Sequence, residues 1–223
     1  MKKIKFRIYV GTIIMLLCFF VALSTTVIFY LNSKANLMNE IADRLRANVT
    51  MSSRLINTEY VKKLKDKINL SEISDLDVKN IEKSLEYKTL YTYLNKIRDA
   101  NPNLILYIYI LVPDKEKNFA RFLVDADVLK LREEEKITGK TTEKISSFNL
   151  RYNITNQPVA SSAIYERKMM IEKDFVYDKD YNSWSMMGFS PIWDEESGDF
   201  LGVVGIDISN YNYIEKRHLF RRQ

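Results

Sequence analysis

The sequence predicts an α+β protein in which an N-terminal transmembrane helix continues into a long helix and then into a domain with a mostly antiparallel sheet. Three observations support this prediction. An uncharged apolar run fills residues 8–31, an uninterrupted helical pattern follows it, and short strand-like runs separated by turns fill much of the second half. With 223 residues and 46% apolar composition, the chain is long enough for one ordinary domain and an appendage.

The appendage is the apolar run itself, which exceeds the roughly 20 residues that a helix needs to cross the hydrocarbon core. Four basic residues and no acidic residue lie within residues 1–7, so the positive-inside rule predicts a cytoplasmic N-terminus and an extracytoplasmic domain over residues 32–209. Without these four charges the net charge of +5 falls to +1, which argues against a nucleic-acid partner. A signal peptide cleaved near Ala22 is the alternative, but the run continues to Leu31, which favours an uncleaved anchor.

Several kinds of chemistry lack their residues in this chain. The single cysteine, Cys18, lies in the apolar run, so the domain has no disulfide. The single histidine, His218, lies in a basic tail over residues 210–223, which excludes histidine triads and histidine metal sites from the domain. No phosphate-binding glycine motif is present, and acid clusters such as Asp178/Asp180 lack calcium-loop spacing. We therefore expect no enzyme, no cofactor and no metal site.

Two helices are predicted after the membrane run. Apolar side chains recur at spacings of mostly three or four over residues 34–68 without glycine or proline, which predicts one long amphipathic helix. This helix also offers a surface for a homodimer. Ser74 and Asp77 have the spacing of a helix start, and a second helix is predicted from there to Asn101-Pro102.

The next stretch predicts an antiparallel hairpin. Residues 104–112, LILYIYILV, form an apolar run between two prolines, and residues 119–124 form a second strand. Strict alternation places Tyr107 and Tyr109 on one face, which we assign to a pocket, although both could equally be core aromatics. Arg121 could neutralise an anionic ligand, and the alternative is a surface pair with Asp125.

The remaining elements lead to a closing hairpin. Residues 125–153 are predicted to form a long irregular loop. A short helix is predicted from Pro158 to about Tyr165, and residues 168–177 are predicted to form one strand-like run. Two apolar runs, residues 186–193 and 200–209, then flank an acidic turn. Asp207 is a lone acid inside the last strand, so it needs either a structural partner, such as backbone groups at the end of the sheet, or a ligand.

Three stretches of the sequence resemble a known family. They are ANPNLILYIYILVPD followed by FLVDAD, then DFVYDKDYNSWSMMGFSPIWD, and finally SGDFLGVVGIDIS. In this order and spacing they are similar to the extracytoplasmic Cache domains, which are PAS-like sensor modules of bacterial histidine kinases, chemoreceptors and nucleotide cyclases. The resemblance implies a PAS-like fold that holds small ligands between its sheet and its loops.

The resemblance also implies where a ligand binds. In amino-acid-binding members a late aspartate contacts the ligand amine, and Asp207 occupies the corresponding place, with Tyr177 near the position of an aromatic contact. The arginine, tryptophan and tyrosine cluster of that subgroup is not present, because Arg167 is followed by Lys168 and two methionines. The ligand-binding candidates are Asp207, Tyr177, Tyr107, Tyr109, Arg121, Asp125, Asp178 and Trp184.

The function expected from the sequence is a membrane-anchored extracytoplasmic sensor that binds a small molecule and relays a conformational signal across the membrane. It would be the sensory part of a histidine kinase, chemoreceptor or nucleotide cyclase system, whose output domain is absent from this chain. The alternative is a structural or protein-interaction module of the same fold that binds no ligand.

Overall fold

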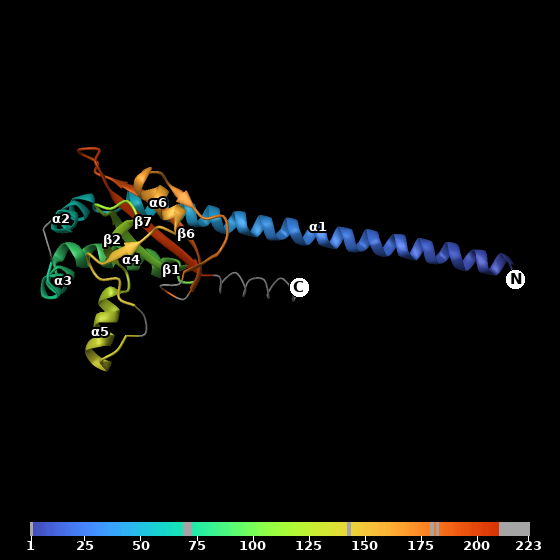
Figure 1. Cartoon of the computed structure of the whole chain (residues 1–223), viewed down its shortest axis with the longest axis horizontal. Helices are drawn as coiled ribbons and strands as arrows, with labels where there is room; N and C mark the ends of the chain where they lie inside the picture. Colours follow the sequence, from blue (N-terminus) through green and yellow to red (C-terminus); the bar gives the residue numbers. More distant parts are fainter. Residues whose placement is uncertain (1, 69–72, 142–143, 179–180, 182, 210–223) are drawn as a thin grey trace. The chain divides into compact units, whose positions relative to one another are not determined.

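The computed structural model describes residues 2–68, 73–141, 144–178, 181 and 183–209. The predicted basic tail, with His218, lies outside the described residues. The chain forms two compact units, Met1–Ile41 and Ala42–Gln223 (Figure 1). The first unit consists of the N-terminal part of helix α1 (Lys2–Arg54), in which the apolar side chains from Val10 to Leu31 are exposed. Among the described residues, α1 is the helix whose length and apolar composition suit a membrane crossing.

The single helix predicted over residues 34–68 is wrong, because two helices occupy this stretch. Helix α1 ends at Arg54 and α2 spans Thr58–Ile68. The Oδ1 atom of Asn57 accepts a hydrogen bond from the Tyr60 amide at 3.0 Å, which is the contact of a helix N-cap. Asn57 starts the new helix as its N-cap, and the sequence around it contains neither glycine nor proline. The break between the two helices therefore lacks the residues that usually mark one.

The second predicted helix is also divided. The structure has α3 (Asp75–Glu82) and α4 (Leu85–Ala100). Ser74 caps α3 as predicted, and its Oγ accepts from the Asp77 amide at 3.2 Å. Ser84 repeats this arrangement for α4 with the Tyr87 amide at 3.4 Å, which separates the two helices.

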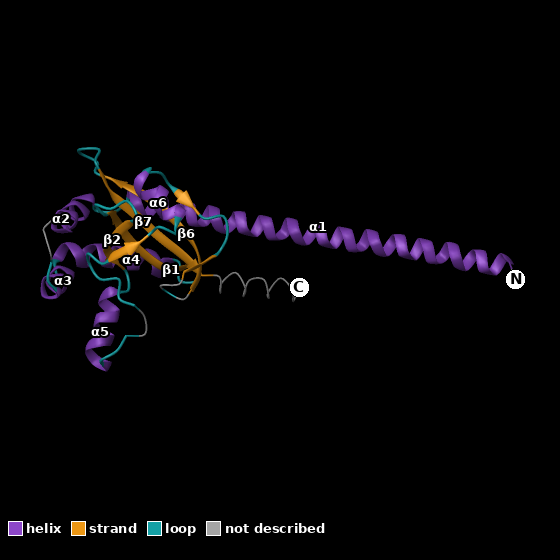
Figure 2. Ribbon diagram, viewed as in Figure 1, coloured by secondary structure: helices purple, strands orange, loops and turns teal. Residues whose placement is uncertain are grey.

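The second unit is built on one antiparallel sheet (Figure 2). Its strand order is β3-β2-β1-β7-β6-β4, and β5 pairs with β6. Every strand pair is antiparallel, as predicted for most of the sheet. The strands are β1 (Ile105–Pro113), β2 (Phe119–Asp125), β3 (Arg151–Asn153), β4 (Met170–Ile171), β5 (Val176–Asp178), β6 (Ser183–Trp193) and β7 (Phe200–Ser209).

Two predictions for the connecting segments are wrong. Residues 125–153 are not wholly irregular, because they contain α5 (Val128–Thr138) and β3. Val128 and Leu131 of α5 are buried three residues apart, which gives this polar helix a packing face too small to be seen in the sequence pattern. Residues 168–177 contain two short strands, β4 and β5, rather than one, and these pair with different parts of β6. Helix α6 (Pro158–Tyr165) agrees with its prediction.

Side chains on the two faces of the sheet pack against different helices. Ile108 and Ile110 of β1 are fully buried, and α4 packs along β1 and β2. Tyr109 and Leu111 belong instead to a buried cluster with Ala160 and Ile164 of α6, so the predicted alternation along β1 is confirmed. Helix α6 lies beside β6 in both ribbon views.

The part of α1 within the second unit, residues 42–54, packs directly on strand β6. Leu45 and Val49 are fully buried, and Ser53 Oγ lies 2.8 Å from Ser190 Oγ of β6 in a buried hydrogen bond. Gly188 of β6 allows the closest approach, because a Cβ atom there would lie 2.7 Å from the Leu45 Cγ atom. Helix and strand are therefore joined both by packing and by a polar contact.

Candidate functional site

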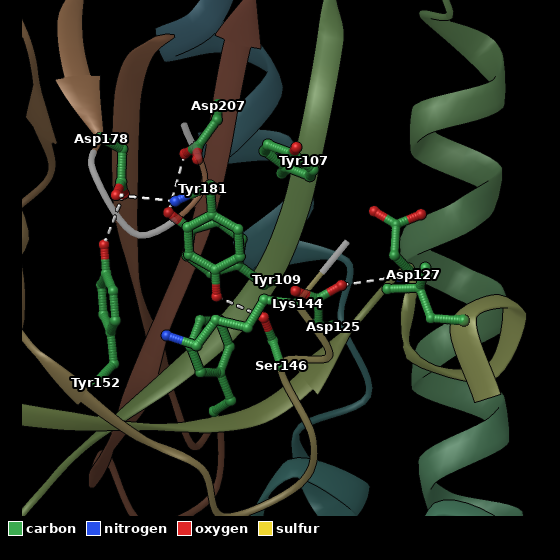
Figure 3. A pocket seen from close by; sticks show the side chains of 12 residues that line it. Tyr107, Tyr109, Asp125, Asp127, Lys144, Ser146, Tyr152, Asp178, Tyr181 and Asp207 are labelled. Atoms are coloured by element: carbon green, nitrogen blue, oxygen red, sulfur yellow. Dashed lines mark hydrogen bonds between the residues drawn. The ribbon is translucent and has the colours of Figure 1, made fainter. Parts of the chain in front are cut away.

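A small cavity lies beside the central strands β1 and β7 (Figure 3). Its volume is about 20 Å³, which is room for a single water-sized group. Carboxylates and tyrosines dominate its lining. The lining residues are Tyr107, Tyr109, Phe122, Asp125, Asp127, Leu131, Lys144, Ser146, Tyr152, Asp178, Tyr181 and Asp207.

Asp207 stands at the centre of the sheet. It lies in β7 between Tyr107 of β1 and Met187 of β6, and only 8% of its surface is exposed. The Tyr109 hydroxyl donates a hydrogen bond to Asp207 Oδ1 at 2.9 Å. Burial raises the pKa of Asp207 well above its ordinary value, and nearby carboxylates add to this, whereas the Tyr109 hydrogen bond opposes it. The partner that the structure gives Asp207 is thus a tyrosine within the cavity.

Glycine makes the contact between Tyr109 and Asp207 sterically feasible. Gly205 lies opposite Tyr109 in the pairing of β1 with β7. A Cβ atom on Gly205 would lie 2.4 Å from Tyr109 Cε2 and 2.9 Å from Phe189 Cε1. The Tyr109 ring therefore occupies the space that a side chain at position 205 would need.

Asp178, at the end of β5, is held by several donors. The Tyr152 hydroxyl donates to its Oδ2 atom at 3.0 Å, and the Gln157 Nε2 atom does so at 3.4 Å. The Tyr181 amide donates to Asp178 Oδ1 at 3.4 Å. Within the described part of the chain, the buried Oε1 atom of Gln157 has no hydrogen-bond partner. Asp178 is thus held in place by two side-chain donors and one backbone amide.

Asp125 ends strand β2 on the other side of the cavity. Its Oδ1 atom accepts from the Asp127 amide at 2.8 Å. Burial raises the pKa of Asp125 to about 7, while its hydrogen bonds with the Asp127 amide and Ser146 oppose this. The Asp127 carboxylate forms an ion pair with Arg98 of α4 at 2.6 Å.

Three of the eight predicted ligand-binding residues lie outside the cavity lining. Arg121 does not pair with Asp125. Its Nε atom lies 2.6 Å from Asp114 Oδ2, and its Nη1 atom donates to Asn149. Tyr177 and Trp184 pack on each other with ring centroids 5.6 Å apart, and they are 41% and 54% exposed. The other five candidates, Asp207, Asp178, Asp125, Tyr107 and Tyr109, line the cavity together.

The sequence pattern missed several lining residues. Three of them, Tyr152, Tyr181 and Ser146, carry hydroxyl groups and lie in short or irregular segments without hydrophobic periodicity. The Tyr181 hydroxyl lies 2.6 Å from Ser146 Oγ, so a hydrogen bond joins these two lining residues. Lys144 also lines the cavity, with its ammonium 5.7 Å from the centre of the Tyr181 ring. In the described ranges, no three potential metal ligands gather into one group.

Comparisons with known proteins find neither a matching family model nor a matching curated protein. The solved structures that match include the ligand-binding domain of the Campylobacter jejuni chemoreceptor Tlp3 in complex with L-valine, with 14% identity, a TM-score of 0.36 and coverage of 81% of this chain and 62% of that chain. The ligand-binding domain of the Pseudomonas aeruginosa PAO1 amino acid chemoreceptor PctC in complex with GABA matches with 12% identity, a TM-score of 0.34 and coverage of 80% and 65%.

A third match is an extracellular domain assigned to a histidine kinase, mmHK1S-Z2, with 13% identity, a TM-score of 0.35 and coverage of 81% of this chain and 61% of that chain. This chain thus spans less than two thirds of the length of each of these structures. By their names, the three structures are sensory domains of two chemoreceptors and of a histidine kinase.

The buried acids predict an unusual dependence of stability on pH. Burial raises the pKa of Asp125 from 3.8 and that of Glu172 from 4.5, each to about 7. Between about pH 4 and 7 the folded chain therefore retains protons that the unfolded chain has lost, so these groups stabilise the fold at low pH and the stabilisation disappears as the pH rises through 7.

We expect the free energy of unfolding to be about 2 to 4 kcal/mol larger at pH 5 than at pH 8, measured by denaturant titration of the full chain in detergent. The double variant Asp125→Asn/Glu172→Gln should have a smaller difference, and the part that remains is expected from Asp207, whose pKa burial also raises. A variant that keeps the full difference would show that other groups cause it.

Proposed function

We propose that the chain is a membrane-anchored extracytoplasmic sensor that binds a small ligand through a positively charged amine at Asp207. In this proposal residues 1–7 are cytoplasmic, residues 8–31 cross the membrane, and residues 32–209 form the sensor domain, followed by the tail of residues 210–223. The chain acts without catalysis and serves a histidine kinase, a chemoreceptor or a nucleotide cyclase. A homodimer through the long helix stays a prediction.

The observation that most strongly supports an amine ligand is the buried Asp207 carboxylate, which lies among tyrosines. A carboxylate in such a place is tolerated when it is hydrogen-bonded and paired with a cation. Tyr109 supplies one hydrogen bond, and an ammonium group in the cavity would supply the charge. The cavity has room for one water-sized group, which matches the size of an ammonium head but not of a whole ligand. A larger amine must therefore push side chains apart as it binds.

Two contacts support a route from this cavity to α1. Met187 lies beside Asp207 in the sheet, and three residues further along β6 Ser190 is hydrogen-bonded to Ser53 of α1. On the other side, Tyr93 of α4 donates through its hydroxyl to the Ser52 carbonyl of α1 at 3.0 Å. A ligand that favours a different arrangement of the cavity would shift the population of these contacts.

The proposal is tested by thermal unfolding of the full chain in detergent with primary amines, zwitterionic amino acids and dicarboxylates. An amine at one hundred times its dissociation constant should stabilise the fold by about 2.7 kcal/mol, whereas a dicarboxylate should not. Stabilisation by dicarboxylates alone would contradict the assignment of Asp207.

The small volume of the cavity favours a second candidate function, a module of the same fold that binds no ligand. In that case the Tyr109–Asp207 hydrogen bond only orders the core. Such a module would show no stabilisation with any compound of the panel, and removing the Asp207 charge would affect its stability alone.

A further inference from the structure

The cavity has two acidic ends, and the Tyr181 side chain spans the space between them. The Tyr181 amide donates to Asp178, which lies near Asp207, and the Tyr181 hydroxyl is hydrogen-bonded to Ser146, which contacts Asp125. Figure 3 shows the Tyr181 ring between Asp178 and Asp207 on one side and Asp125 on the other. The Tyr181 residue thus connects the two acidic ends through its contacts with Asp178 and Ser146.

The charges of the cavity do not balance with a single cation. Among the described residues that line it, four are carboxylates and one, Lys144, is basic. Asp127 is neutralised by Arg98 at 2.6 Å, which leaves three carboxylates, those of Asp125, Asp178 and Asp207, facing one lysine. Burial favours the protonated forms of Asp125 and Asp207, and an ammonium group beside either carboxyl favours its ionised form. Once both are ionised, a ligand with one ammonium group leaves an excess of negative charge, and the carboxylate of a zwitterion would add to it. A ligand with two positive charges brings the site to neutrality.

The space between the acidic ends suits an aliphatic chain. The Tyr181 ring lies next to those of Tyr107 and Tyr152, with centroid distances of 5.8 Å and 6.5 Å. Aromatic faces accept both methylene groups and ammonium groups.

On the basis of the function proposed above, we propose that the ligand is an aliphatic α,ω-diamine. One ammonium group binds at Asp207 and Asp178, and the other binds at Asp125. Because the cavity holds only one water-sized group, the methylene chain takes the place of the Tyr181 ring between Tyr107 and Tyr152. The Tyr181 hydroxyl then leaves Ser146, so their hydrogen bond is broken.

The experiment is isothermal titration calorimetry of the full chain in detergent at pH 8. The probes are 1,3-diaminopropane, 1,4-diaminobutane and 1,5-diaminopentane, each compared with the monoamine of the same chain length. We expect at least one diamine to bind about tenfold or more tightly than its monoamine, because a second charge-assisted hydrogen bond forms. Asp125→Asn should remove this preference, so that each diamine binds the variant no more tightly than the monoamine of the same chain length. The exposed Asp75→Asn variant is the matched control and should retain the preference.

The outcomes separate this inference from the function on which it rests. If monoamines bind as tightly as diamines to the unmodified chain, the second cationic site is wrong and the amine sensor stands. If Asp125→Asn weakens both kinds of ligand equally, Asp125 does not bind a second ammonium group. If neither kind binds, the amine sensor itself is contradicted. The comparison on the unmodified chain decides the question even if the variant does not fold.

Discussion

Replacing Asp207 by asparagine should weaken amine binding by about 100-fold or more while the melting temperature stays the same or rises. The loss is large because the bound ammonium would keep its desolvation cost without its buried counter-charge. The fold should persist because asparagine has the same shape and keeps an oxygen to accept the Tyr109 hydrogen bond. Removing a buried carboxylate also relieves its cost of desolvation, which is greatest above neutral pH.

This result is checked by calorimetry with butylamine and by thermal unfolding of the same samples. Asp75→Asn, on the exposed surface of α3, is the control for the change of carboxylate to amide and should alter neither measurement. Unfolding of Asp207→Asn at pH 7 would identify Asp207 as a structural acid. If the folded variant binds amines as tightly as the unmodified chain, the ligand does not bind at Asp207 of β7.

The second large effect is expected from Gly205→Ala. The new methyl group would lie 2.4 Å from Tyr109 Cε2, so either the ring or the strand must move. Overpacking of this kind costs about 1 to 3 kcal/mol, and we expect a value near the upper end because Phe189 closes the other side at 2.9 Å. For a chain of this size the melting temperature should fall by roughly 5 to 10 °C.

A double-mutant cycle tests the cause of this destabilisation. Tyr109→Leu removes the distal ring atoms, so the combination Gly205→Ala/Tyr109→Leu should be less destabilised than the sum of the two single variants. Strict additivity would show that the glycine is required for another reason. The same displacement of Tyr109 should withdraw its hydroxyl from Asp207 and weaken amine binding.

The central part of the site could be predicted because it lies on long strands. Alternation along β1 specifies the face of Tyr107 and Tyr109, and a lone acid within the apolar strand β7 identifies Asp207. The same rule explains two of the candidates that lie elsewhere. Arg121 precedes Phe122, and Tyr177 precedes Asp178, so each points away from the face on which its neighbour lines the cavity.

The positions of the other lining residues depend on tertiary contacts, which leave no pattern in the local sequence. The segment that bears Ser146 is fixed by the Phe148 amide, which donates to the buried Glu82 carboxylate at 3.1 Å, and Glu82 also pairs with Arg132 at 3.0 Å. Asn149 then adopts a φ of 67°. Such a path follows from a contact between α3 and α5 that is distant in sequence. The breaks at Asn57 and Ser84 were missed for a related reason, since one capping side chain decides them.

The contact of Gly188 with Leu45 has a mechanical consequence for any signal that begins in the cavity. Because strand β6 carries no side chain at this point, the buried Leu45 side chain of α1 packs directly over the strand. Close-packed interiors have low compressibility, so a movement of β6 by a fraction of an ångström must displace the helix by a similar amount. Helix α1 and strand β6 are therefore expected to move together. A side chain added at position 188 would push α1 away from β6 and change the position of the helix in the protein without ligand.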